Sequence, residues 1–138
     1  MAFNGDVLRD LASQFLALAE KQEGTVPLMI GHRLMGTSLM ARGDIAESQV
    51  HYDKALALYD PAEHRPLSTR FGQDVSVVIL SYRSWTRWLL GYPEAALADT
   101  DHALKNARET GQASSLIYAS SHGSFTHIFC GNYAAVNA

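Results

Sequence analysis

The stretch that decides the fold is Ile30–Pro61, which reads IGHRLMGTSLMARGDIAESQVHYDKALALYDP. Gly43 separates two segments whose apolar residues recur with helical spacing, and this pattern predicts two antiparallel helices joined by a tight turn. The small residues Gly36 and Ser48, one on each segment, favour a close approach of the two helix backbones. Tyr52 is then expected to fill the space between neighbouring helix pairs. The stretch therefore predicts an all-α stack of helix pairs, whose chemistry is recognition rather than catalysis.

The spacing within this stretch resembles that of the tetratricopeptide repeat. His32 takes the position of the first bulky residue, and Pro61 takes that of the closing proline. Met35 and Gly36 stand where the repeat has its Leu-Gly pair. The resemblance implies an all-α fold of about six helices, arranged as tetratricopeptide-like antiparallel hairpins stacked in a right-handed superhelix.

Two further glycines are expected to form turns between helices, as Gly43 does. Gly91 follows it by 91 − 43 = 48 residues, and Gly131 follows Gly91 by 131 − 91 = 40 residues. Both spacings exceed the roughly 34-residue unit, and the first surplus falls in residues 61–74, which contain helix-breaking Pro and Gly. We therefore expect a single fragment spanning residues 1–138. Its expected parts are an orphan second helix (6–22), a repeat (26–61), an inserted loop (61–74), a repeat (75–109) and a partial repeat (113–138).

Periodicity and capping signals place the individual helices. Asp6 and Asp74 are expected as N-caps, Pro93 in the first turn of its helix, and Gly24 as the stop of the first helix. Neither end carries the polar capping repeat that closes a solenoid, so we expect the chain to be part of a longer protein. The expected helices span residues 6–22, 26–42, 44–60, 75–90, 93–109 and 113–130.

Composition limits the class of partner. The net charge of −3 and the pI near 6.0 argue against a nucleic-acid binder, which normally carries a basic surplus. The single cysteine, Cys130, rules out an internal disulfide framework and fits a reducing compartment. There is no apolar run of membrane-spanning length and no signal sequence. We expect a cytoplasmic chain that contacts neither nucleic acid nor membrane.

A closer resemblance covers nearly the whole chain. Residues 59–67 (YDPAEHRPL) and 71–74 (FGQD) are its most specific parts, because ordinary tetratricopeptide repeats lack them. Together with WLLGYPEAALA and ALKNARETG, they resemble the C-terminal helical repeats of large bacterial signalling proteins that fuse an adenylate/guanylate cyclase to an AAA-type ATPase. The resemblance implies a regulatory or scaffolding region. The cyclase and ATPase motifs are not in this chain, so no enzymatic activity is expected of it.

The tetratricopeptide resemblance predicts a concave binding groove lined by the first helix of each hairpin. Its composition, rich in Trp, Tyr and Phe with one Arg as a polar anchor, is typical of binding hot spots. We expect a protein or peptide partner, or another domain of the parent protein, to bind there. The competing reading is that these aromatic residues pack against neighbouring helices. The candidate groove residues are Arg33, Thr37, Met40, Trp85, Trp88, Tyr118 and Phe125.

Two alternatives remain open. In the first, the groove and the inserted loop, with Arg65, Arg70 and Asp74, close over a small-molecule effector, because a long loop in a compact repeat array is often functional. In the second, exposed terminal helices pair between two chains as a homodimer.

Other chemistry is not expected. The six histidines are scattered, and His122 and His127 are five residues apart, so no metal site is predicted. There is no phosphate-binding loop or nucleophile motif, which predicts no catalytic residue and no cofactor. Arg83 and Arg87 are expected to face the partner helix, so Asp99 or Asp101 must pair with them unless the helix is rotated.

Overall fold

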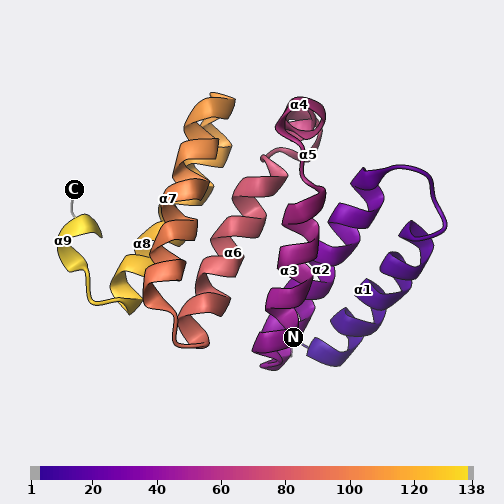
Figure 1. Ribbon diagram of the computed structural model, residues 1–138, viewed down its shortest axis with the longest axis horizontal. Coiled ribbons are helices and arrows are strands. Elements are labelled where there is room, and N and C mark those ends of the chain that lie inside the picture. The colour runs from indigo at the N-terminus through magenta and orange to yellow at the C-terminus, as the bar shows by residue number, and fades with distance from the viewer. Residues whose placement is uncertain (1–3, 137–138) are drawn as a thin grey trace. The chain divides into compact units, whose positions relative to one another are not determined.

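The computed structural model describes residues 4–136 and is all-helical over that range. It divides into two compact units, one ending at Tyr59 and the other beginning at Asp60. The first unit contains α1 (Gly5–Ala19), α2 (Thr25–Arg42) and α3 (Ile45–Leu58), and α2 packs against both of the others (Figure 1).

Small residues set the spacing of the first unit. A Cβ atom on Gly36 would lie 2.8 Å from the Tyr52 ring, and the Ser48 hydroxyl donates a 2.6 Å hydrogen bond to the Gly36 carbonyl. The predicted close approach is therefore confirmed. The Tyr52 ring lies against Gly36 of the same hairpin, whereas we had expected it between neighbouring pairs. On the other side of α2, Leu16 of α1 lies against Gly31, where a Cβ atom would be 2.9 Å away.

The second unit is built on three long helices, and α7 packs against both α6 and α8, which also contact each other (Figure 1). Asp74 caps α6 as predicted, and Pro93 occupies the first turn of α7 as predicted. The helices of this unit are α4 (Pro61–His64), the 3₁₀ helix η1 (Arg65–Leu67), α5 (Ser68–Phe71), α6 (Val75–Leu89), α7 (Pro93–Thr110), α8 (Ala113–Phe129) and α9 (Tyr133–Val136).

The six long helices lie within three residues of their predicted bounds. The expected count of about six helices was wrong, because the inserted loop at 61–74 is largely helical and residues 133–136 form a further helix. Pro61 begins a helix there instead of breaking one, since the first turn needs no N–H donor and the Asp60 side chain caps the Ala62 N–H at 3.0 Å. Residues 137–138 of the predicted partial repeat lie outside the described range.

Two capping predictions for the first helix were also wrong. Asn4, not Asp6, caps α1, and its side-chain oxygen accepts from the backbone N–H groups of Asp6 and Val7. The helix ends at Ala19, and Gly24 stands directly before α2 with φ at 104°. A glycine with positive φ can stand before a helix as well as after one, so Gly24 alone did not determine where α1 ends.

The structure resolves how Arg83 and Arg87, both partly buried, are paired. Asp99, 3% exposed, accepts from Arg83 Nε at 2.9 Å and Nη2 at 2.8 Å, and from Arg87 Nη1 at 3.0 Å. One carboxylate of α7 thus holds two guanidinium groups of α6, and Asp101 is exposed. The α6 helix therefore keeps the predicted register toward α7.

In the range that the structure describes, none of the helices combines the length and the hydropathy needed to cross a lipid bilayer.

Candidate functional site

The main candidate surface is a row of aromatic rings on α6 and α8 of the second unit, called here the aromatic row. Its members recur every three or four residues along each helix, and this spacing puts them on one helix face. Ring contacts link the two helices at several levels, including Trp85 to Phe125 at 6.0 Å and Trp88 to Phe129 at 4.8 Å between centroids. The row consists of Tyr82, Trp85, Trp88, Tyr118, His122, Phe125 and Phe129.

His122 lies at the centre of the row. Its ring stacks on Tyr118 with centroids 4.1 Å apart and on Trp85 with centroids 4.8 Å apart. Its Nδ1 lies 3.0 Å from the Tyr118 carbonyl, and the Trp85 indole N–H donates to the His122 carbonyl at 3.3 Å. Burial lowers the pKa of His122, and the hydrogen bond to the Tyr118 carbonyl opposes that shift. The stack therefore contains a neutral imidazole near pH 7.

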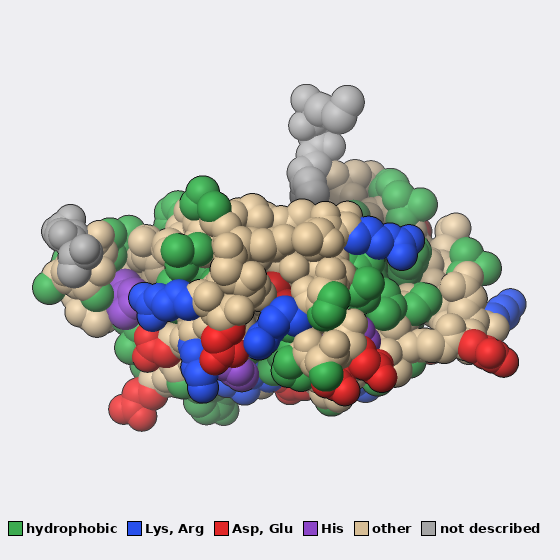
Figure 2. Space-filling model, turned by 90° about the horizontal axis from the view of Figure 1, so that it is seen from above, with side chains coloured by type: hydrophobic (Ala, Val, Ile, Leu, Met, Phe, Trp, Pro, Cys, Tyr) green, Lys and Arg blue, Asp and Glu red, His purple; other side chains and the backbone are tan. Residues whose placement is uncertain are grey.

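One end of the row is open to solvent. Phe125 is 50% exposed and Phe129 is 41% exposed, and Ile128 between them is 40% exposed. Residues 111–138 contain no Asp, Glu, Lys or Arg, so α8 offers no charge to a partner. On the face seen in Figure 2, by contrast, acidic and basic side chains lie next to one another. Exposed aromatic side chains on an uncharged helix are the composition expected of a contact surface.

A pocket beside the row adds a concave element. It has a volume of about 420 Å³ and opens to solvent next to the Tyr118–His122 stack. Its walls combine hydroxyl groups with apolar surface, the mixed lining that ligand pockets have. The lining residues are Gln73, Ser114, Ile117, Tyr118, Ser121 and His122.

The structure brings together four of the predicted groove residues, namely Trp85, Trp88, Tyr118 and Phe125, all of which belong to the aromatic row. Arg33, Thr37 and Met40 belong to the first unit. The Thr37 hydroxyl donates to the Arg33 carbonyl at 3.1 Å and lies 3.0 Å from the Tyr52 hydroxyl, so Thr37 takes part in the α2–α3 contact.

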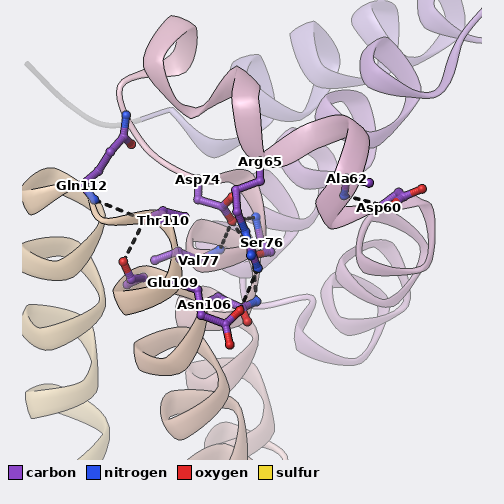
Figure 3. Close-up of polar contacts among 11 residues, drawn as sticks. Asp60, Ala62, Arg65, Asp74, Ser76, Val77, Asn106, Glu109, Thr110 and Gln112 are labelled. Atoms are coloured by element: carbon purple, nitrogen blue, oxygen red, sulfur yellow. Dashed lines mark hydrogen bonds and ion pairs between the residues drawn. The ribbon is translucent and has the colours of Figure 1, made fainter.

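The three predicted loop residues have separate surroundings. Arg65, labelled in Figure 3, pairs with Glu109 of α7, with Nη2 3.0 Å from Oε2. Arg70 lies over the Phe71 ring, with Cζ 5.8 Å from the ring centroid. Asp74 is fully buried, and its carboxylate accepts from the Ser76 N–H at 2.9 Å. The Arg65 and Asp74 interactions join the 61–74 segment to α7 and to α6.

The backbone N–H of Asp74 is also held. It donates to the Ser115 hydroxyl of α8 at 3.0 Å. Asn106 of α7 donates to the Ser76 hydroxyl at 2.9 Å, and Figure 3 shows this amide beside the start of α6. The start of α6 is thus joined to both α7 and α8, which fixes the helix that carries the two tryptophans.

The sequence reasoning missed Tyr82, His122 and Phe129. Each lies three or four residues from a residue that was predicted, so the helical period itself would have found them. It also missed a contact between His32 and His51, whose Nδ1 atoms are 3.0 Å apart. Cys130 is partly exposed, and partial burial raises the pKa of its thiol.

No protein-family model, no curated protein and no solved structure matches this chain. Within residues 4–136, no group of three or more His, Cys, Asp or Glu side chains is arranged to hold a metal ion.

Proposed function

We propose that the chain is a non-catalytic, tetratricopeptide-like interaction module that binds an apolar peptide segment or the apolar face of a helix across the aromatic row. The observation that carries the proposal is the exposure of Phe125 and Phe129 beside the stacked rings on an uncharged helix. Hairpins that turn at Gly43 and Gly91 with positive φ, and the packing of α8 on both α6 and α7, support a repeat architecture.

The aromatic row is already ordered before a partner binds. Trp85 is fixed by its hydrogen bond to the His122 carbonyl and by ring contacts, so little side-chain entropy is lost when a partner covers it. Phe125 and Phe129 supply the apolar area that leaves water. Burying one such side chain contributes about 1.5–3 kcal/mol before the cost of association.

The resemblance to the repeats of cyclase–ATPase signalling proteins supports a regulatory or scaffolding role. In such a protein, the partner would be another domain of the same chain or a separate protein of the cytoplasm. The effector alternative has less support, because Arg65 and Asp74 each have an interaction partner within the unit.

The test uses the only two tryptophans, Trp85 and Trp88, because both lie in the row and report its occupancy by fluorescence. A phage-displayed library of random peptides is selected against the chain, and the enriched peptides are titrated. We expect apolar, aromatic-rich peptides that shift the emission, with affinity nearly constant between low and high salt because the row carries no charge.

Phe125→Ala and Phe129→Ala are expected to weaken binding about 30-fold, the loss typical of a hot-spot residue. The matched control is Phe71→Ala, a phenylalanine of similar exposure (42%) outside the row. Equal losses in the control and in the row variants, or enrichment of acidic peptides with steep salt dependence, would contradict the proposal.

A second candidate function, self-association, is favoured by the outer face of α1. Val7, Leu11, Phe15 and Leu18 are all 39% exposed or more, while the opposite face packs against α2. A helix that is apolar on both faces is normally covered on both. Sedimentation velocity over a range of concentrations tests it: a dimer that Leu11→Glu dissociates supports the pairing, and a monomer at every concentration refutes it.

A further inference from the structure

Two histidines of the first unit form a hydrogen-bonded pair across the α2–α3 hairpin. The Nδ1 atoms of His32 and His51 are 3.0 Å apart, and the ring centroids are 5.2 Å apart with planes inclined by 35°. The two rings therefore meet head-on, Nδ1 to Nδ1, instead of stacking face to face. One helical turn away, towards the turn at Gly43, the Ser48 hydroxyl donates to the Gly36 carbonyl. Of these two polar contacts between α2 and α3, the histidine pair is the one that can take up protons near neutral pH.

The hydrogen bond determines where the neutral pair carries its protons. One Nδ1 carries a hydrogen and donates, and the other accepts with its lone pair, so the two rings are different tautomers. A first added proton goes to the Nε2 of the donor ring and leaves the bond in place, strengthened by its charge. A second added proton has to occupy the accepting lone pair. That step breaks the bond and leaves two cations next to each other, which repel.

Charged groups on the neighbouring helices act on both rings. Burial lowers the pKa of His32, and the charges of His51 and Lys54 lower it further. Burial and Lys54 likewise lower the pKa of His51. Glu20, the C-cap of α1, raises the pKa of His32, and Glu47, one turn before His51 on α3, raises the pKa of His51. Each ring thus has a carboxylate of its own that favours its protonated form.

We propose that the His32–His51 pair is a proton-driven switch that exchanges the contacts of α2. Near neutral pH, the hydrogen bond ties α2 to α3. When both rings are protonated, they separate: His32 turns towards Glu20 of α1, and His51 turns towards Glu47 of its own helix. The two rings are partly exposed and the two carboxylates are exposed, so these side chains can rotate without opening the core. Acidification therefore replaces an α2–α3 contact with an α1–α2 contact.

The lowered pKa of both rings sets the direction of the switch. The unfolded chain takes up protons at the ordinary histidine pKa of 6.5, before the folded pair takes up both. The contribution of the pair to stability is therefore complete above pH 6.5 and is lost as the pH falls towards the folded-state pKa. The pair lies in the first unit, so the switch is independent of the aromatic row and of the function proposed for it.

The test follows the imidazole nitrogens of the ¹⁵N-labelled chain by NMR between about pH 8 and about pH 5. At the upper limit, we expect one of the two rings to be protonated at Nδ1 and the other at Nε2. In His51→Gln, the pKa of His32 should shift upwards, because the repulsion by the second ring is gone. In Glu20→Gln it should shift downwards. The matched control, His102→Gln, alters an exposed histidine of α7 and should leave the titration of His32 unchanged.

A second measurement needs no variant. In the wild-type chain, the backbone amide signals around Glu20 should shift in the same pH step in which His32 is protonated, because its imidazolium moves towards that carboxylate. Two rings that are both protonated at Nε2 near pH 8 would overturn the proposal, since neither could then donate. Signals around Glu20 that do not respond to the protonation of His32, or an unchanged titration of His32 in His51→Gln, would also overturn it.

Discussion

Replacing Asp99 with Asn tests how the second unit is held together. The Asp99 carboxylate, whose side chain is 4% exposed, is the shared partner of Arg83 and Arg87, whose side chains are 11% and 23% exposed. The amide keeps the shape of the side chain but removes its charge and one acceptor atom. Two guanidinium groups at the α6–α7 contact then lose the negative charge of the carboxylate that they share.

The expected loss follows from the cost of an uncompensated buried charge. Removing one partner of a buried ion pair costs about 3–5 kcal/mol, much more than an exposed pair contributes. The partial exposure of Arg87 lets water reach one of the two guanidinium groups, so we expect a value near the lower end, about 3 kcal/mol. This corresponds to a fall of about 10 °C in Tm for a chain of this size.

Urea denaturation followed by circular dichroism measures the loss, with Asp101→Asn as the control on the same helix. Asp101 is exposed, so its variant is expected to stay within about 0.5 kcal/mol of wild type. A triple variant, Arg83→Met with Arg87→Met and Asp99→Leu, should regain most of the stability because no charge is left buried. If Asp99→Asn and Asp101→Asn lower the unfolding free energy by the same small amount, the Asp99 ion pairs do not stabilise the α6–α7 contact and the reasoning fails.

Two further predictions concern close packing and pH. Gly36→Ala should lower the unfolding free energy by about 1–2 kcal/mol, since overpacking against the buried Tyr52 ring outweighs the gain in helix propensity. Combining Gly36→Ala with Tyr52→Leu should relieve the clash. Urea melts in which Gly36→Ala is as stable as wild type would contradict the prediction. The lowered pKa of His122 means that the unfolded chain takes up a proton first as pH falls below the ordinary value of 6.5. The difference in unfolding free energy between wild type and His122→Gln should therefore decrease as the pH is lowered from 6.5 to the folded-state pKa, and should stay constant below it. Urea melts at several pH values measure this difference, and a difference that is independent of pH would contradict the prediction.

The sequence predicted the long helices well because their boundaries depend on local signals. Gly43 and Gly91 adopt positive φ at the turns, and Asp74 caps α6 through its own side chain. The 61–74 segment was missed because Pro61 breaks a helix in its interior but favours one at its first turn, and sequence alone did not decide between these positions.

The candidate site was predicted only in part, since it depends on contacts between helices. Trp85 and Phe125 were found by counting repeat positions, but His122 was considered only for metal binding, not as a stacking partner. The His32–His51 contact was missed because histidines were compared along single helices. Antiparallel pairing about Gly43 places residue 36 opposite residue 48, and one turn further the same pairing places His32 opposite His51.

The lack of charge on α8 has a consequence for mapping the surface by mass spectrometry. Trypsin cuts after Lys and Arg, and residues 109–138 contain neither, so these residues stay together in one peptide that contains all of α8. Cleavage after Arg83 and Arg87 releases residues 84–87, which carry Trp85, as a separate short peptide. Labelling by hydroxyl radicals, with and without a partner, would therefore report the α6 and α8 sides of the surface in different peptides of a single digest.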